Sequence, residues 1–134
     1  MIDLTVVWAQ EEGTQDSLSA DRAALERIET AMGEGDARML LTSAAERVEL
    51  TIFDMRSFYS RTQALYVIQD FFGSYAPQHF SFEDISCRDD RCSATGAYGH
   101  ARSEDDVLRV YVRLGVDEGE WLLRELRIER NAQP

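Results

Sequence analysis

The most regular alternation of hydrophobic and polar residues lies between Val107 and Val116. From Leu108 onward every second residue is aliphatic, which is the pattern of a strand with one buried face. Turn-forming residues occupy positions 117–120, and the strand pattern resumes over 121–128. These positions predict a long hairpin with one continuous aliphatic face, which other elements must cover.

Three earlier stretches have the spacing of amphipathic helices that could provide this cover. Gly33 closes the first stretch, and Asp36 precedes the second as a helix cap. Ser60 and Gln63 form a capping box before the third, because each side chain can bond the other's free backbone donor. We expect helices over residues 20–32, 37–44 and 61–73, packed on one face of the sheet.

Further strand patterns complete an antiparallel sheet. Phe80 and Phe82 share a face that Ile85 does not, which predicts a β-bulge near residues 83–84. The strand after it contains several small residues, such as Gly96, which leave room for a ligand or for a close helix. The resulting fold class is α+β, with the helices gathered on one face of a curved sheet. We expect strands over 46–53, 58–59, 79–87 and 92–100, with turns at 88–91 and 103–106.

The length of 134 residues fits one domain. The patterns place this domain over residues 20–130, between a lead-in at 1–19 and a tail at 131–134. All 14 basic residues are arginine, and the 25 acidic residues give a net charge of −11. So acidic a chain repels phosphate groups, which disfavours binding to nucleic acid or to an anionic membrane. The short apolar run near the start is too short for membrane insertion.

The lead-in at 1–19 has two interpretations. Leu4 to Ala9 is an apolar run, and Val7 and Ala9 place small residues where a signal peptidase would read them. The segment would then be the remnant of a signal peptide followed by a linker, and the protein would be exported. Alternatively, the segment is an N-terminal arm that packs on the sheet, and a cytoplasmic location stays open.

Cys87 and Cys92 flank the turn at 88–91, so in a regular hairpin they face each other at a distance that allows a disulfide. A disulfide would suit an exported protein. Two free buried thiols are the alternative. A zinc site would need two further ligands, and the chain contains only His79 and His100. We therefore expect neither a metal nor another cofactor.

Several segments together carry a family resemblance. They are Gly35 to Ala37, Arg47 to Ile52, Tyr59 to Ala64 leading to Asp70 and Phe72, Arg109 to Tyr111, and Trp121 to Glu129. The pattern resembles the NTF2-like superfamily of cone-shaped α+β proteins and, within it, the bacterial DUF4783 family of unknown function. The resemblance covers about residues 33–130 and implies a pocket-forming scaffold with about three helices on a curved antiparallel sheet. It also implies export, since members of that family often look exported.

Two polar side chains are candidates for catalysis, His100 at the end of a strand and Asp70 in the third helix. Each has a plainer interpretation, because a histidine at a strand end and an aspartate on the outside of a helix are commonly solvated. A cavity in the cone would be lined by Tyr59, Tyr66 and Tyr98 together with His100, since a phenol has an apolar body and a polar tip. Ordinary half-buried packing of the tyrosines is the alternative.

The face of the hairpin that points away from the aliphatic surface carries a mixed ladder of arginine, glutamate and apolar side chains. This face can be solvated, or it can pair with a copy of itself in a two-fold dimer. NTF2-like proteins commonly dimerise through the sheet, so the resemblance favours a homodimer. The residues of this face are Arg109, Tyr111, Arg113, Leu123, Glu125 and Arg127.

No paired acid, base or nucleophile set is recognisable in the sequence, although some NTF2-like proteins are isomerases, dehydratases or cyclases. This favours a non-catalytic module that binds a small apolar ligand or a partner protein. A small isomerase- or cyclase-type enzyme is one alternative, and it requires His100 to converge with Tyr98 or Asp70 inside one cavity. A structural homodimer is the other, and it requires a cone filled by side chains.

Overall fold

The computed structural model describes residues 20–130, so the expected lead-in at 1–19 and tail at 131–134 lie outside the described residues. The first helix of the described part occupies residues 20–34 and is called the N-terminal helix below. The other elements are α2 (Ala37–Thr42), β1 (Ala44–Ile52), β2 (Met55–Ser60), α3 (Arg61–Ser74), β3 (Pro77–Arg88), β4 (Arg91–His100), β5 (Ser103–Asp117) and β6 (Glu120–Arg130).

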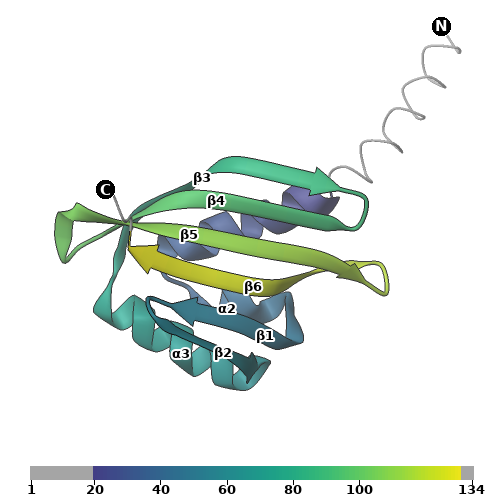
Figure 1. Ribbon diagram of the computed structural model, residues 1–134, viewed down its shortest axis with the longest axis horizontal. Coiled ribbons are helices and arrows are strands. Elements are labelled where there is room, and N and C mark those ends of the chain that lie inside the picture. Colours follow the sequence, from purple (N-terminus) through teal and green to yellow (C-terminus); the bar gives the residue numbers. More distant parts are fainter. Residues whose placement is uncertain (1–19, 131–134) are drawn as a thin grey trace, which may run out of the picture.

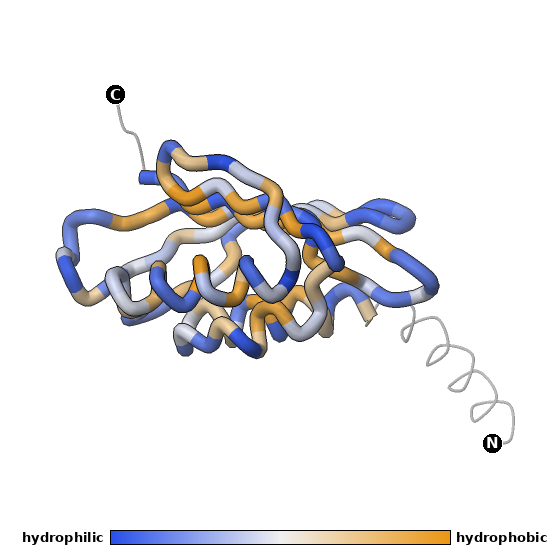
Figure 2. Tube along the Cα trace, turned by 90° about the horizontal axis from the view of Figure 1, so that it is seen from below, coloured by the Kyte–Doolittle hydropathy of each residue, from blue (hydrophilic) through white to orange (hydrophobic). Residues whose placement is uncertain are grey.

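All six strands form one curved sheet in the order β2-β1-β6-β5-β4-β3, with the helices on one side of it (Figure 1). The same one-sided arrangement is visible from below, where the helices lie against the strands (Figure 2). The predicted α+β class is therefore confirmed. Neighbouring strands are antiparallel except β1 and β6, which run parallel. This pair was not predicted, because the strands are far apart in sequence and no hairpin fixes their direction.

The aliphatic face of β5 is the centre of the core. Leu108, Val110, Val112 and Leu114 are each at most 1% exposed, as their alternation predicts. Burial of each such side chain stabilises the fold by roughly 1.5–3 kcal/mol. The N-terminal helix helps to cover this core with one apolar stripe, of which every member is buried. The stripe consists of Ala24, Leu25, Ile28, Ala31 and Met32.

The helix caps form as the sequence predicts. The Asp36 carboxylate accepts a hydrogen bond of 3.0 Å from the backbone N–H of Met39 at the start of α2. At the start of α3, the Ser60 hydroxyl accepts from the Gln63 N–H, and the Gln63 side-chain oxygen accepts from the Ser60 N–H, both at 3.1 Å. None of the helices within residues 20–130 combines the length and the apolar composition that crossing a membrane requires.

Two turns are shorter than expected. Asp89 and Asp90 alone connect β3 to β4, and Asp89 adopts a positive φ of 52° to close the turn. Ala101 and Arg102 connect β4 to β5, so residues 103–106 belong to β5 rather than to a turn. Ser103 pairs with His100 directly across the second turn, and the register then shifts before Leu108 pairs with Tyr98.

The register between neighbouring strands shifts at several points, and two of these shifts bear on the predicted faces. The one predicted in β3 is confirmed, because the register against β4 shifts between Phe82 and Asp84. The one in β6 was missed: Glu125 lies opposite Arg113, whereas Leu123 lies opposite Leu114, which leaves Arg124 as the extra residue. The assignment of Leu123 to the outer face of the hairpin is therefore wrong. Its side chain is in the core and 1% exposed.

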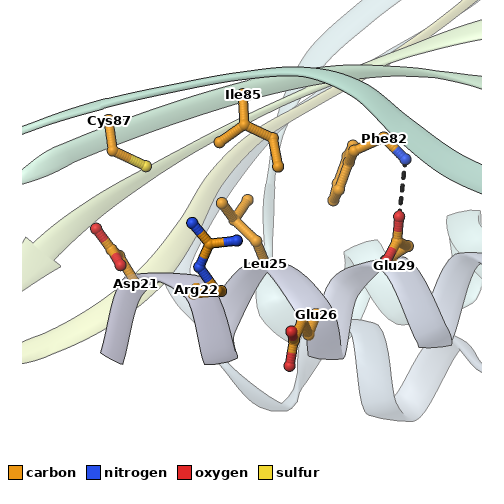
Figure 3. A pocket seen from close by; sticks show the side chains of 8 residues that line it. All are labelled: Asp21, Arg22, Leu25, Glu26, Glu29, Phe82, Ile85 and Cys87. Atoms are coloured by element: carbon orange, nitrogen blue, oxygen red, sulfur yellow. Dashed lines mark hydrogen bonds between the residues drawn. The ribbon is translucent and has the colours of Figure 1, made fainter. Parts of the chain in front are cut away.

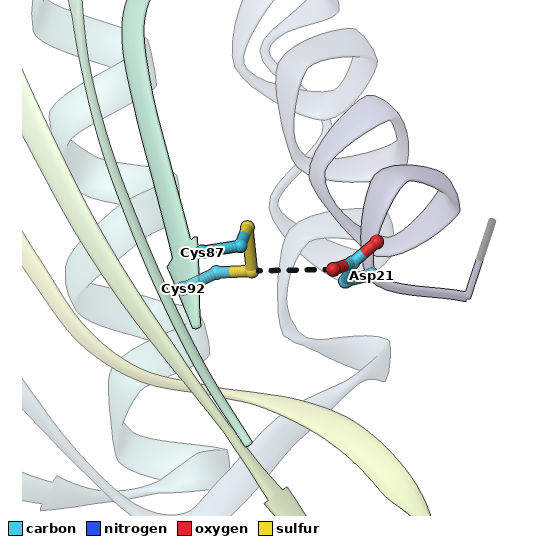
Figure 4. Close-up of side chains that lie close together, drawn as sticks. All are labelled: Asp21, Cys87 and Cys92. Atoms are coloured by element: carbon cyan, nitrogen blue, oxygen red, sulfur yellow. Dashed lines mark hydrogen bonds between the residues drawn. A yellow bond between two sulfur atoms is a disulfide. The ribbon is translucent and has the colours of Figure 1, made fainter. Parts of the chain in front are cut away.

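Cys87 and Cys92 lie opposite each other across the β3–β4 turn and form a disulfide (Figure 4). Their Cα atoms are 4.1 Å apart. The Asp21 carboxylate at the start of the N-terminal helix lies 3.8 Å from the Cys92 Sγ. Because both sulfur atoms are bonded to each other, neither is a thiolate that could ligate a metal.

Reduction of this disulfide is expected to lower the free energy of unfolding by about 2 kcal/mol, the loss of loop-closure entropy in the unfolded chain. The measurement is urea unfolding with and without a phosphine reductant. The Cys87→Ala/Cys92→Ala variant is the control, because the reductant has no bond to cleave there. Unchanged stability of the fully reduced wild type would contradict this account of the bond.

Candidate functional site

The Tyr98 side chain on β4 is fully buried, with an exposure of 0%. Its ring centroid lies 5.5 Å from that of Phe71 and 6.4 Å from that of Phe80. Its hydroxyl donates a hydrogen bond of 2.5 Å to the backbone carbonyl of Tyr75. Burial raises the pKa of the Tyr98 phenol well above its ordinary value. Tyr98 therefore belongs to the core instead of lining an open cavity.

His100 is buried, with an exposure of 1%, so the interpretation of this histidine as solvated is wrong. The Nδ1 atom accepts a hydrogen bond from the backbone N–H of Arg102, and Nε2 lies 3.3 Å from the Asp106 carboxylate. Since Nδ1 accepts a hydrogen bond, Nε2 carries the ring hydrogen and donates a hydrogen bond to Asp106. The imidazole ring also lies 5.0 Å from the ring of Tyr75, in an edge-on arrangement. Both ring nitrogens are thus engaged within the fold.

The Asp106 carboxylate also forms an ion pair with the guanidinium of Arg130, at 2.6 Å. The hydrogen bond from Arg130, more than the one from His100, holds the pKa of the Asp106 carboxyl below its usual range. This group of charged residues closes the end of the β5–β6 pair. The group acts as a structural clamp.

The other predicted site residues lie apart from His100. Asp70 is exposed on α3, and Tyr66, one turn earlier, is 66% exposed and points away from the core. Tyr59 is half-buried on β2. Asp70 and Tyr59 do line one common cavity, which contains neither Tyr66, Tyr98 nor His100. The structure thus brings together two of the five residues that we proposed from the sequence.

That cavity has a volume of about 480 Å³ and lies between α3 and the turn that joins β1 to β2. We call it the α3 cavity. Aliphatic side chains of β1 and α3 form its floor, and it is partly open to solvent. Four aromatic rings and two carboxylates complete its wall. These are Phe53, Tyr59, Phe71 and Tyr75, with Asp54 and Asp70.

Three of these rings form a cluster that the sequence did not predict. Phe53 follows β1 with a positive φ of 57°, and its N–H donates to the Ile128 carbonyl at 2.8 Å. This conformation places its ring 5.3 Å from that of Tyr75 and 6.4 Å from that of Phe71. The Phe71 and Tyr75 rings are stacked at 5.3 Å. A left-handed phenylalanine is rare, so no pattern in the sequence could reveal it.

A second hollow, of about 400 Å³, separates the N-terminal helix from β3 (Figure 3). Its wall is more highly charged, with Asp21, Arg22, Glu26 and Glu29 on the helix. Figure 3 shows Glu29 directed at the β3 bulge, where its carboxylate accepts a 2.8 Å hydrogen bond from the Phe82 N–H. A bulge leaves a backbone group without its ladder partner, and Glu29 satisfies it. Glu29 in the charged wall of this hollow thus has a structural role.

The face of the sheet opposite the helices carries ion pairs. Glu125 is 7% exposed and accepts from Arg113 at 3.3 Å and from Arg127 at 3.0 Å. The Arg127 guanidinium also lies 4.9 Å over the ring of Tyr111. Glu49 on β1 pairs in the same way with Arg56 on β2. With Leu123 removed from it, the predicted ladder forms a continuous polar face.

Comparisons with known proteins agree with this architecture. Crystal structures of DUF4783 family proteins from Bacteroides ovatus and Bacteroides uniformis superpose with TM-scores of 0.73 and 0.75. At 19% and 18% identity they cover 80% and 81% of this chain, and 94% and 97% of their own. An NTF2-like protein of unknown function from Silicibacter pomeroyi, 16% identical, covers 88% of this chain and 98% of its own at a TM-score of 0.62.

These likenesses confirm the NTF2-like fold that the sequence resembles. No curated protein matches the chain. The family described as "Domain of unknown function (DUF4783)" matches residues 25–129, which is most of the chain. The protein is therefore a member of the DUF4783 family with an NTF2-like fold.

Proposed function

We propose that the protein is a non-catalytic binding module that holds one small, largely apolar molecule in the α3 cavity. The observation that carries this proposal is the cavity itself, a concave and mainly apolar space of about 480 Å³ with a few polar groups at its wall. Ligand sites in proteins have this size and this composition. The fully buried Tyr98 does not line this space.

The state of the candidate catalytic residues supports binding over catalysis. General acid–base chemistry needs a titratable group within hydrogen-bond reach of a substrate. His100 is buried with both ring nitrogens bonded, and the Tyr98 hydroxyl is bonded to a carbonyl. Asp70 lines the α3 cavity without either of them. Neither His100 nor Tyr98 is therefore available to pair with Asp70 as acid or base at the cavity wall.

The test is a titration with N-phenyl-1-naphthylamine, a neutral apolar dye that fluoresces when it leaves water. Binding to the wild type is expected to be saturable with one site. Val67→Trp fills the cavity from its α3 wall and is expected to abolish the signal. Tyr66→Trp, at the exposed neighbouring position, is the control and is expected to bind as the wild type does. Equal binding by both variants would place the dye elsewhere and contradict the proposal.

We also propose that the protein works as a homodimer through the face opposite the helices. The support is that no helix within residues 20–130 covers this face, and that it carries both signs of charge, so two copies can pair about a two-fold axis. A native mass spectrum is expected to show twice the chain mass. Arg109→Glu on this face should give monomers, and Arg38→Glu on α2 should leave the dimer intact. A monomeric wild type at micromolar concentration would contradict the proposal.

We further propose that the protein is exported. The Cys87–Cys92 disulfide supports this, because such bonds persist in oxidising compartments. The check is alkylation of the protein from its own source after rapid acid quenching. A protein that resists alkylation until it is reduced is expected, whereas two alkylated cysteines would place the protein in a reducing compartment.

A further inference from the structure

We infer that the ligand of the α3 cavity is an apolar organic cation, a quaternary or tertiary ammonium that carries a hydrophobic group. This inference rests on the proposed binding function and names the chemical class of the ligand. Three independent properties of the cavity point to it: its aromatic wall, its charge, and the cations that its rings already attract.

The aromatic wall is the first property. Phe53, Phe71 and Tyr75 form a connected cluster with centroid separations of 5.3 to 6.4 Å, and Tyr59 lines the same space from β2. The face of an aromatic ring carries negative electrostatic potential, and several rings around one space attract a weakly hydrated cation. Quaternary ammonium groups are recognised by rings arranged in this way.

The charge of the wall is the second property. Asp54 and Asp70 are exposed at the cavity, and neither has an ion-pair partner among residues 20–130. No arginine or histidine of the described chain lines this cavity, and the sequence has no lysine. Four other hollows in the same part of the protein each include at least one arginine. The α3 cavity thus has two uncompensated negative charges beside an apolar floor.

The third property is that two of the rings already hold cations on their outer sides. The Arg130 guanidinium lies 4.6 Å from the centroid of Phe53, and that of Arg102 lies 5.0 Å from the centroid of Tyr75. Neither arginine lines the cavity, so both cations lie outside the ligand space. Asp106 neutralises Arg130 through their 2.6 Å ion pair, which limits its repulsion of a second cation.

The nature of the wall also selects among cations. A primary ammonium requires three hydrogen-bond acceptors, and most of this wall is carbon. An ammonium that bears methyl groups loses little hydration when it enters such a space. An anion would face two carboxylates in a chain of net charge −11, and a neutral molecule would gain nothing from them.

The experiment compares two ligands of the same shape, phenyltrimethylammonium and its neutral carbon analogue tert-butylbenzene. Each competes with N-phenyl-1-naphthylamine, and calorimetry measures the ammonium directly. We expect the cation to bind at least tenfold more tightly than the neutral analogue. We expect Asp54→Asn/Asp70→Asn to weaken the cation about tenfold and to leave the neutral analogue unchanged.

The matched control is Asp89→Asn/Asp90→Asn, which removes the same two charges from the exposed β3–β4 turn. It is expected to leave the preference for the cation unchanged, so that a loss in the cavity variant reflects local charge instead of net charge. Equal affinity for the two ligands would overturn the cation inference and leave the binding function standing. Failure of the dye and of both ligands to bind would overturn the two together.

Discussion

Replacement of Gly96 by alanine is expected to destabilise the protein by about 3 kcal/mol or more, the upper end of what overpacking costs. Gly96 lies in β4 opposite the β3 bulge. A methyl group there would meet two ring carbons of Phe80 at 3.0 Å and would collide with the backbone carbonyl of Ser81. A side chain can move aside, but the carbonyl belongs to a paired strand. The whole bulge would have to shift.

Gly99→Ala is the matched control for this prediction, since it makes the same chemical change three residues later in the same strand. The added methyl group would lie 2.9 Å from the Cε1 atom of His79, which is the end of an exposed side chain and can rotate away. We expect a change below about 1 kcal/mol. Urea unfolding of both variants measures the difference. Similar losses would show that the bulge is pliable and would refute this account of Gly96.

Stability at alkaline pH is expected to depend on Tyr98. Burial raises the pKa of its phenol above the unfolded value of 10. The folded protein therefore keeps this proton up to a higher pH than the unfolded chain does. The stabilisation is complete below pH 10 and is lost as the pH rises from there towards the folded pKa. The loss approaches about 1.4 kcal/mol for each pH unit once the tyrosine of the unfolded chain is mostly ionised.

Tyr98→Phe isolates this effect. At pH 7 the variant should be about 1 kcal/mol less stable, because the Tyr75 carbonyl loses its hydrogen bond. Its stability should fall less steeply above pH 10 than that of the wild type, so the two curves approach each other. Tyr66→Phe is the control, since it makes the same chemical change at an exposed ring. Parallel curves for the wild type and Tyr98→Phe would contradict the assignment of the alkaline transition to this residue.

The elements of the fold that depend on local pattern could be predicted from the sequence. Strict alternation predicted the buried face of β5, and the hydroxyl and amide of Ser60 and Gln63 predicted the start of α3. The β3 bulge was predicted because Phe82 and Ile85 are out of phase. Leu123 was assigned to the wrong face because regular alternation was assumed to continue across Arg124, where the strand has a bulge. Nothing in the local sequence marks that extra residue.

The candidate site was harder to predict, because it depends on tertiary contacts. Tyr59 and Asp70 were proposed from their residue types, and the fold brings them to one cavity. Phe53 reaches the same cavity through a left-handed backbone, and Tyr75 through its position one residue beyond α3. Tyr98 and His100 were proposed as lining residues for good chemical reasons. Their burial depends on tertiary packing, which the local sequence pattern does not reveal.

The order of the strands bears on how the chain assembles. β1 and β2 come early in the sequence, yet their contact with the rest of the sheet passes through β6, the last strand. A nascent chain can therefore form the β3–β4–β5 meander while its first hairpin has no sheet to join. Only when residues 120–130 leave the ribosome can the two parts become one sheet. A stop codon shortly before β6 would remove one strand but leave two separate fragments of sheet.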